Sequence, residues 1–357
     1  MTAGSCGTTL GDTGDPMVLD LDVHDSEKGM QRPPDAVAPT MARAIQYTEF
    51  GGPEVLTLVD IPDPEPGKGE VAVRVEAVGI NPVEWKQRSA LRDTGRITSP
   101  RRPGSDAAGV VTAVGKGVEG LRVGEPVVVF LATGTYATDI AVPASHVQPR
   151  PPAVSAAEGA ALGIPVGTAY QTVRSLAVGP GDTLLIHGGS GAVGQAAIQF
   201  ARMWGATVVA TTSARRAQRV QDLGATPVGY ESEGLEDRIL AAAPQGITAA
   251  IDIAGTDKAI EASLGLVRDH GRIATLVRGA DAARLGIRAF SGGSPEPLTP
   301  LELAWRAEAI PVALALMAHG AFAVELGPSY PLAEASEAQR IVQSGVDGKV
   351  VLLPWGD

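Results

Sequence analysis

The chain has 357 residues, of which 44% are hydrophobic and 19% charged, so it is long enough for two soluble domains with separate cores. Its formal net charge of −11 argues against nucleic acid or an anionic membrane as the main partner. The single cysteine, Cys6, excludes an internal disulfide and a zinc site built from several thiolates.

The first 40 residues differ in composition from the rest. They are rich in Gly, Thr, Asp and Pro, show no hydrophobic period and hold seven acids and two bases, or −5 of the net charge. We predict a disordered extension over 1–40, with Met41 or Met30 as candidates for the native start. The first residues lack the basic and apolar regions of a signal peptide, and no apolar run approaches the roughly 20 residues that span a bilayer. We therefore expect a cytoplasmic protein.

From Met41 the pattern is typical of short strands separated by Gly and Pro. Residues 43–47 and 55–60 flank a Gly-Gly-Pro turn and predict a hairpin. Further strands are expected at 70–78, 109–114, 125–130, 137–142 and 146–148. Together they predict a compact, partly open barrel, which helices at 156–162 and 168–176 leave.

Residues 183–213 predict a strand, a glycine turn, a helix and a second strand. Glycines at 189, 191 and 194 have GxGxxG spacing, and apolar residues with a period of 3.6 follow at once. Glycine lets the backbone approach a pyrophosphate, while the N–H groups at a helix start favour its negative charge. In this setting the motif predicts a dinucleotide site, although a glycine-rich turn that binds nothing is the alternative. The expected cofactor contacts in the turn are Gly189, Ser190, Gly191, Ala192, Val193 and Gly194.

Strands and helices then alternate, which predicts a doubly wound parallel sheet. Helices are expected at 214–223, 235–242 and 256–267, with strands at 227–230, 249–253 and 271–277. Residues 283–290 predict one more strand at the sheet edge, and the Gly/Pro/Ser-rich loop 291–300 is a candidate lid or linker. Residues 301–319 read as a helix that Pro311 should kink or divide. A strand, a helix and a strand at 324–331, 333–343 and 349–353 are expected to return to the first lobe.

Several segments together resemble the medium-chain dehydrogenase/reductase superfamily, in its zinc-independent quinone oxidoreductase branch, which includes zeta-crystallin. They are IQYTEFGGPEV from residue 45, GINPVEWKQR from 79, PGSDAAGVVTAVGKGVEGLRVGEPV from 103, GIPVGTAYQTV from 163, the glycine turn, and GKVVLLP from 348. The resemblance covers about 41–357. It implies a GroES-like catalytic domain at 41–163, completed by 300–357, and an NADPH-binding Rossmann domain at 164–299.

The sequence departs from the zinc-dependent members of this superfamily. Alcohol dehydrogenases carry a cysteine ligand near the position of Asn81 and a His-Glu pair where this chain has Ser105 and Asp106. The four-cysteine structural zinc lobe is missing as well. The resemblance therefore implies an enzyme without catalytic zinc.

The second predicted strand of the nucleotide domain ends at Ser213, followed by Arg215 and Arg216. An NAD-specific fold usually carries Asp or Glu there, whereas guanidinium groups can bind a 2′-phosphate. NADPH is therefore the expected cofactor; the alternative is a solvated helix face formed by these arginines and Arg219. The resemblance places Tyr230 near the 2′-phosphate, with strand-end packing as the alternative.

Two further cofactor contacts are expected. Gly255 follows a strand and leaves space for the cofactor. Thr168 is a candidate contact to nicotinamide or phosphate, and helix N-capping is its alternative role.

The sequence offers no nucleophile with an adjacent base, but hydride transfer to a quinone or to the β-carbon of an enone needs neither nucleophile nor metal. A few hydrogen-bond donors suffice, because negative charge spreads onto the acceptor oxygen. The resemblance implies Asn81 as such a donor and Lys86 as a residue near the substrate. Their alternatives are loop capping and a solvated lysine. Asp106 is expected to order the cleft wall.

The sequence thus predicts a zinc-independent, NADPH-dependent reductase of quinones or α,β-unsaturated carbonyls. The alternatives are a biosynthetic enoyl reductase of the same superfamily and a non-catalytic NADPH-binding sensor or scaffold. Relatives also suggest a homodimer joined through the edge strand at 283–290.

Overall fold

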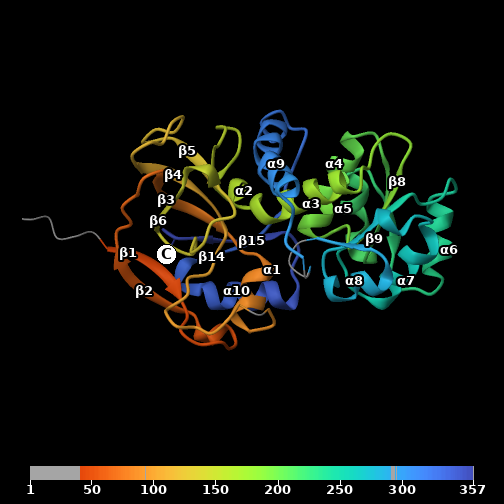
Figure 1. Cartoon of the computed structure of the whole chain (residues 1–357), viewed down its shortest axis with the longest axis horizontal. Helices are drawn as coiled ribbons and strands as arrows, with labels where there is room; N and C mark the ends of the chain where they lie inside the picture. The colour runs from red at the N-terminus through yellow and green to blue at the C-terminus, as the bar shows by residue number, and fades with distance from the viewer. Residues whose placement is uncertain (1–40, 93, 291–293, 295, 357) are drawn as a thin grey trace, which may run out of the picture. The chain divides into compact units, whose positions relative to one another are not determined.

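The computed structural model describes residues 41–357 except 93, 291–293, 295 and 357. The predicted extension at 1–40 and part of the candidate lid at 291–300 lie outside these residues. Figure 1 shows the described chain.

The first lobe contains the predicted hairpin and a larger sheet (Figure 1). Strands β1 (Met41–Gln46) and β2 (Thr57–Pro62) pair antiparallel, as expected. The larger sheet has the order β14-β15-β3-β4-β5-β7, with β6 also paired to β3. Its strands from this lobe are β3 (Glu70–Gly79), β4 (Asp106–Val114), β5 (Pro126–Val129), β6 (Asp139–Pro143) and β7 (Val147–Pro149). The end strands β14 and β7 do not pair, so among the described residues the barrel is open, as predicted.

Three helices follow strands of this lobe, and two of them lead on to the nucleotide sheet. Helix α1 (Pro82–Arg88) follows β3, while α2 (Ala156–Ala160) and α3 (Gly163–Ser175) leave the lobe. The described residues also form single 3-10 turns at Pro53–Val55, Ala144–His146, Ala214–Arg216, His270–Arg272 and Leu332–Glu334.

The second sheet is parallel throughout and has the order β10-β9-β8-β11-β12-β13. Its central strand β8 (Thr183–His187) is buried at every residue, because helices cover both faces of such a sheet. The strands around it are β9 (Thr207–Thr212), β10 (Thr226–Gly229), β11 (Ala249–Asp252) and β12 (Ile273–Thr275). The helices are α4 (Ala192–Met203), α5 (Ala217–Asp222), α6 (Leu235–Ala242) and α7 (Asp257–Leu266). The predicted doubly wound sheet is confirmed.

Two predictions in the C-terminal third need correction. Residues 283–290 do not form one strand: helix α8 (Gly279–Leu285) ends at Gly286, whose φ of 68° is left-handed, and only β13 (Arg288–Ala289) joins the sheet. Pro311 does not divide its helix, since α9 (Pro300–Ala318) is continuous. Pro311 and Ala307 are both exposed, so water can solvate the carbonyl that loses its helical partner.

The chain then returns to the first sheet, as predicted. Strands β14 (Leu326–Pro331) and β15 (Lys349–Leu353) run parallel to each other, with helix α10 (Ala335–Ser344) between them. Strand β15 pairs antiparallel with β3, at Val351 opposite Gly79.

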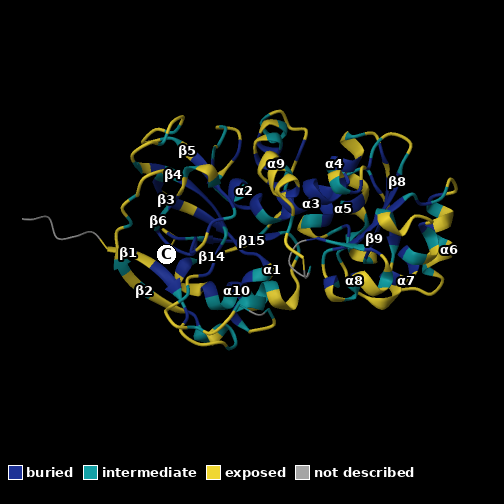
Figure 2. Cartoon of the chain, in the orientation of Figure 1, coloured by how far each residue is buried: buried dark blue, intermediate teal, exposed yellow. Residues whose placement is uncertain are grey.

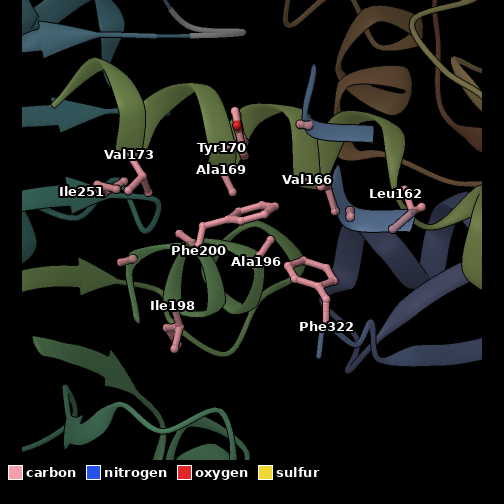
Figure 3. Close-up of a cluster of buried hydrophobic side chains, with 14 of the residues drawn as sticks. Leu162, Val166, Ala169, Tyr170, Val173, Ala196, Ile198, Phe200, Ile251 and Phe322 are labelled. Atoms are coloured by element: carbon pink, nitrogen blue, oxygen red, sulfur yellow. The ribbon is translucent and has the colours of Figure 1, made fainter. Parts of the chain in front are cut away.

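One hydrophobic cluster joins the nucleotide sheet to the helices beside it (Figure 3). The edge of Tyr170 on α3 meets the ring of Phe200 on α4, with centroids 5.0 Å apart, and Phe322 packs against Phe200 at the same distance. Figure 2 shows buried residues concentrated in the strands and along helices such as α3. This packing fixes α4, and with it the glycine turn.

Candidate functional site

The glycine turn lies between His187, the last residue of β8, and Ala192, the first residue of α4. A Cβ on Gly194 would lie 2.8 Å from the Gly189 Cα, and one on Gly189 would lie 2.5 Å from the Ala210 Cβ. Packing therefore requires both glycines. A Cβ on Gly191 would meet nothing nearer than 3.7 Å, so this glycine leaves open space at the helix start.

The start of α4 suits an anion. Its N-cap, Gly191, makes no side-chain capping bond, and the first amides of a helix lack intrahelical acceptors. Gly191 and Ala192 are exposed, while Ser190 and Val193 are half-buried. These N–H groups and the positive end of the helix dipole favour a phosphate group.

A pocket opens beside this turn. It is bordered by α4, by α3 and by the two segments that return to the first sheet. The lining includes Ala192 and Gln195 on α4, Val166 on α3, and Glu325 and Lys349 on the returning segments. Groups from the helices beside the nucleotide sheet and from the segments that return to the first sheet thus face the space next to the predicted dinucleotide site.

The arginines predicted to bind a 2′-phosphate meet carboxylates. Arg216, with its side chain 13% exposed, donates through both terminal nitrogens to Glu325. Arg215, 72% exposed, pairs with Asp347. Ser213, the N-cap before these arginines, is half-buried. Arg216 is therefore not part of a solvated face, whereas Arg215 is.

Tyr230 is 49% exposed and follows β10. Its amide donates to the Thr212 carbonyl at 3.3 Å, which places the residue at the same sheet edge as Ser213. Tyr230 therefore does not pack in the interior, and its ring is accessible beside the arginines.

Gly255 lies in the loop after β11, with a φ of 71°. Asp252 holds this loop, because its Oδ1 accepts from the amides of Ala254 and Gly255 at 3.1 and 2.8 Å. Its Oδ2 accepts from the Thr275 hydroxyl at 2.8 Å, so the Asp252 carboxylate is used structurally.

Thr168 lies within α3, so it is not an N-cap. The residue is 3% exposed, and its hydroxyl has no hydrogen-bond partner among the residues that the structure describes. The contact of Thr168 with the nicotinamide or a phosphate stays a prediction.

Asn81 is the centre of a buried polar network. Its Nδ2 lies 2.8 Å from the Asp106 Oδ2 and 3.3 Å from the Glu84 Oε1, and its Oδ1 accepts from Lys349. It also caps α1, since its amide donates to Glu84 at 2.8 Å. The prediction that Asn81 donates to substrate stays a prediction; in this structure its N–H groups point to protein acceptors. The Tyr136 hydroxyl completes the network with a 2.7 Å bond to Glu84.

Burial perturbs every charge in this network. Burial raises the pKa of Glu84 to about 7, although hydrogen bonds from Asn81 and Tyr136 and the charge of Lys349 oppose the rise. Burial likewise raises the pKa of Asp106 and lowers the pKa of Lys349. Asp106 also accepts from the Ile164 amide at 2.8 Å and so holds the start of α3, which agrees with its expected ordering role.

The network does not provide the donors of a catalytic zinc site. Such sites use three ligands from Cys, His, Asp and Glu, and no group of three such residues in metal-binding range occurs in the described part of the chain. The Lys349 Nζ already donates to Asn81.

Lys86 lies on α1, half-buried, with its Nζ 5.6 Å from the centre of the Trp85 ring. Burial and the charge of Arg92 lower its pKa. A second pocket nearby is lined by Glu84, Gln87, Ser105 and residues of the 100–104 loop, but not by Lys86. The structure thus places Asn81 within the polar network, whereas Lys86 lies near the Trp85 ring and does not line the second pocket.

Sequence reasoning missed Glu84, Tyr136, Lys349, Glu325 and Asp347. Glu84 carried a readable signal, because Asn81 and Glu84 have the spacing of a capping box. Glu325 carried none, since it lies 109 residues from Arg216 in the chain.

The fold and the glycine turn define a two-lobed dehydrogenase/reductase, and comparisons with known proteins agree. Residues 67–153 match the family model for the alcohol dehydrogenase GroES-like domain, and residues 192–289 match that for zinc-binding dehydrogenase. Human quinone oxidoreductase is 32% identical over 339 residues, covering 89% of this chain and 99% of that protein. The chain belongs to the quinone oxidoreductase branch of the medium-chain dehydrogenase/reductase superfamily, and it is an oxidoreductase.

Solved structures are similar over the same range. Escherichia coli quinone oxidoreductase complexed with NADPH has a TM-score of 0.75 and 27% identity, covering 87% of this chain and 100% of that one. A mycobacterial protein complexed with NADPH has a TM-score of 0.74 and 30% identity, covering 88% and 100%. No helix in the described part of this chain has the length and apolar character of a membrane span.

Proposed function

We propose that this oxidoreductase binds NADPH and reduces quinones or α,β-unsaturated carbonyls without zinc. The observation that carries the proposal is the glycine turn between β8 and α4, whose open side at Gly191 and uncapped first helical amides suit a pyrophosphate. Two similar structures, 27% and 30% identical, are complexes with NADPH, and a 32% identical relative is a quinone oxidoreductase.

The chain's own residues suit this cofactor. The amides around Gly191 would hold the pyrophosphate, and Arg216 with Tyr230 would hold the 2′-phosphate. The Thr168 hydroxyl, which lacks a protein partner, would contact the nicotinamide half or a phosphate. NADPH, when bound, would supply the hydride.

The absence of zinc from this proposal rests on the donor set. The zinc enzymes of the superfamily have ligands or their partners at the positions of Asn81, Ser105 and Asp106. Only Asp106 among these three residues has a carboxylate, and one carboxylate does not make a zinc site. A quinone or enone spreads negative charge onto oxygen, so hydrogen-bond donors and nearby cations suffice. We assign the donor role to Asn81 and a position near the substrate to Lys86.

The organisation and setting of the protein are part of the same proposal. We assign 41–163 with 300–357 to the catalytic domain and 164–299 to the cofactor domain, as β15 pairs with β3 rather than with the nucleotide sheet. We propose a cytoplasmic homodimer, with β13 at the edge of the nucleotide sheet as its contact.

The test is to mix the purified protein with NADPH and a panel of quinones and enones, and to follow nicotinamide absorbance. Oxidation with quinones supports the proposal, whereas turnover confined to one class of enone would favour a biosynthetic enoyl reductase. Tight NADPH binding without oxidation by any acceptor would favour a sensor or scaffold. A requirement for tightly bound metal would contradict the zinc-free mechanism.

A further inference from the structure

The arginine cluster beside the nucleotide turn already pairs with carboxylates from the segments that return to the first sheet. Arg216 places its two terminal nitrogens on Glu325, with the Nη1–Oε1 bond at 2.9 Å. Its remaining side faces Asp347, with Nε 3.5 Å from Oδ1. A guanidinium has two edges for paired hydrogen bonds, and carboxylates face both.

Glu325 is held firmly in this position. Its Oε2 accepts from the side-chain Nε2 of Gln195 at 2.6 Å, and its backbone carbonyl accepts from the backbone N–H of Lys349 at 2.7 Å. Arg219 bonds Gln195 at 2.9 Å and lies 3.8 Å from Glu325. Burial acts to raise the pKa of Glu325, but bonds from Arg216 and Gln195 outweigh it and hold the pKa below its usual value. The group is therefore a carboxylate at neutral pH.

The charges around Arg216 decide what a 2′-phosphate would meet. Arg215, Arg216 and Arg219 bring three positive charges, and Glu325 with Asp347 brings two negative ones. A phosphate of nearly two negative charges cannot pair with Arg216 while Glu325 keeps its place, because like charges would share one partly buried site. NADH, which has a 2′-hydroxyl instead, does not need Arg216.

We propose that Glu325 competes with the 2′-phosphate of NADPH for Arg216 and thereby sets the preference between NADPH and NADH. The inference rests on the proposed function for the identity of the cofactor. In this scheme NADPH binding separates Arg216 from Glu325, and so breaks the ion pair between the nucleotide lobe and the segment before β14. NADH binding leaves that ion pair intact.

The test is the Glu325→Gln variant, with dissociation constants measured by titration calorimetry for NADPH, NADH and 2′,5′-ADP. Removing the competing charge should tighten NADPH and 2′,5′-ADP by about tenfold, the effect of one charge-assisted bond, and change NADH by less than about twofold. Asp347→Asn, at a 37% exposed position that tolerates change, should tighten NADPH about two- to threefold. Glu308→Gln is the matched control: it removes the same charge from a 46% exposed residue that pairs with Arg174, and all three affinities should stay unchanged.

A double-mutant cycle shows whether Glu325 acts through Arg216. In an Arg216→Ala background, Glu325→Gln should no longer improve NADPH binding. Weaker NADPH binding by Glu325→Gln would overturn the proposal and make Glu325 an orienting residue for Arg216. Tightening of NADH by the same factor as NADPH would also overturn it. Failure of the folded wild type to bind any of the three ligands would refute the proposed cofactor. NADPH binding that none of the variants changes would refute the role of Glu325 alone.

Discussion

The substitution Gly194→Ala separates the packing role of the glycine turn from its binding role. A methyl group at this position would lie 2.8 and 2.9 Å from two backbone carbons of Gly189 and closer still to the Gly188 carbonyl oxygen. Real contacts of a Cβ essentially never fall below 3.0 Å, and all three neighbours are backbone atoms that no rotamer change can move. Helix α4 must therefore shift away from the end of β8.

The magnitude follows from two opposing terms. Overpacking a well-packed site costs about 1–3 kcal/mol, while alanine in place of glycine within a helix returns up to about 1 kcal/mol. We expect a net loss of about 1–2 kcal/mol, which lowers the melting temperature by about 1.5–3 °C in a protein of this size. Affinity for NADPH should fall as well, because the amides of the first turn move with the helix.

Gly191→Ala is the matched control. Its methyl group would meet nothing nearer than 3.7 Å, and the φ of −76° suits any residue. The melting temperature should fall by less than about 2 °C, because alanine is a poorer N-cap than glycine by roughly 0.5–1 kcal/mol and no steric clash adds to that cost. NADPH binding should weaken, because the methyl enters the space where the pyrophosphate is expected. Scanning calorimetry and NADPH titration measure both effects. An unchanged melting temperature in Gly194→Ala, or a larger loss in Gly191→Ala than in Gly194→Ala, would refute the reasoning.

Three further perturbations test other parts of the structure. Burial lowers the pKa of His187 to about 4 in the folded protein, from 6.5 in the unfolded chain. As the pH falls from 6.5 towards 4, the unfolded chain binds a proton that the folded protein does not, so the free energy of unfolding decreases. Between pH 7 and 4, urea unfolding of His187→Gln should therefore show a smaller stability loss than the wild type, by up to about 3 kcal/mol; equal losses would contradict this account. Asn81→Ala removes the side-chain acceptor of the buried Lys349 Nζ and should cost about 1.5–3 kcal/mol by the same assay, part of which Lys349→Met should restore. Arg216→Ala should reduce the NADPH-over-NADH preference in kcat/KM about tenfold, and Arg215→Ala, at a 72% exposed position, by less than about threefold; a larger effect at Arg215 would reverse the assignment.

Local patterns were enough to predict most of the elements. Alternation and turn residues gave the strands of the first lobe, and the period of 3.6 after the glycine turn gave α4. The errors occurred where local signals compete with tertiary context. Residues 283–290 suited a strand, but the seven-residue helix α8 extends to Leu285 and is closed by Gly286. Pro311 predicted an interruption of the helix, but α9 is continuous because Pro311 lies on its exposed side, where water can solvate the unpaired carbonyl.

The candidate site divides in the same way. The sequence alone determined the glycine turn, the arginines after β9, the single tail cysteine and the departure from zinc ligands, because each depends on residue type and short spacing. Only the tertiary structure decided the partners of those residues. Lys349 meets Asn81 across 268 positions and Arg216 meets Glu325 across 109, because the chain returns to the first sheet after completing the second. No pattern along one segment reports which charge will lie opposite another once distant strands pair.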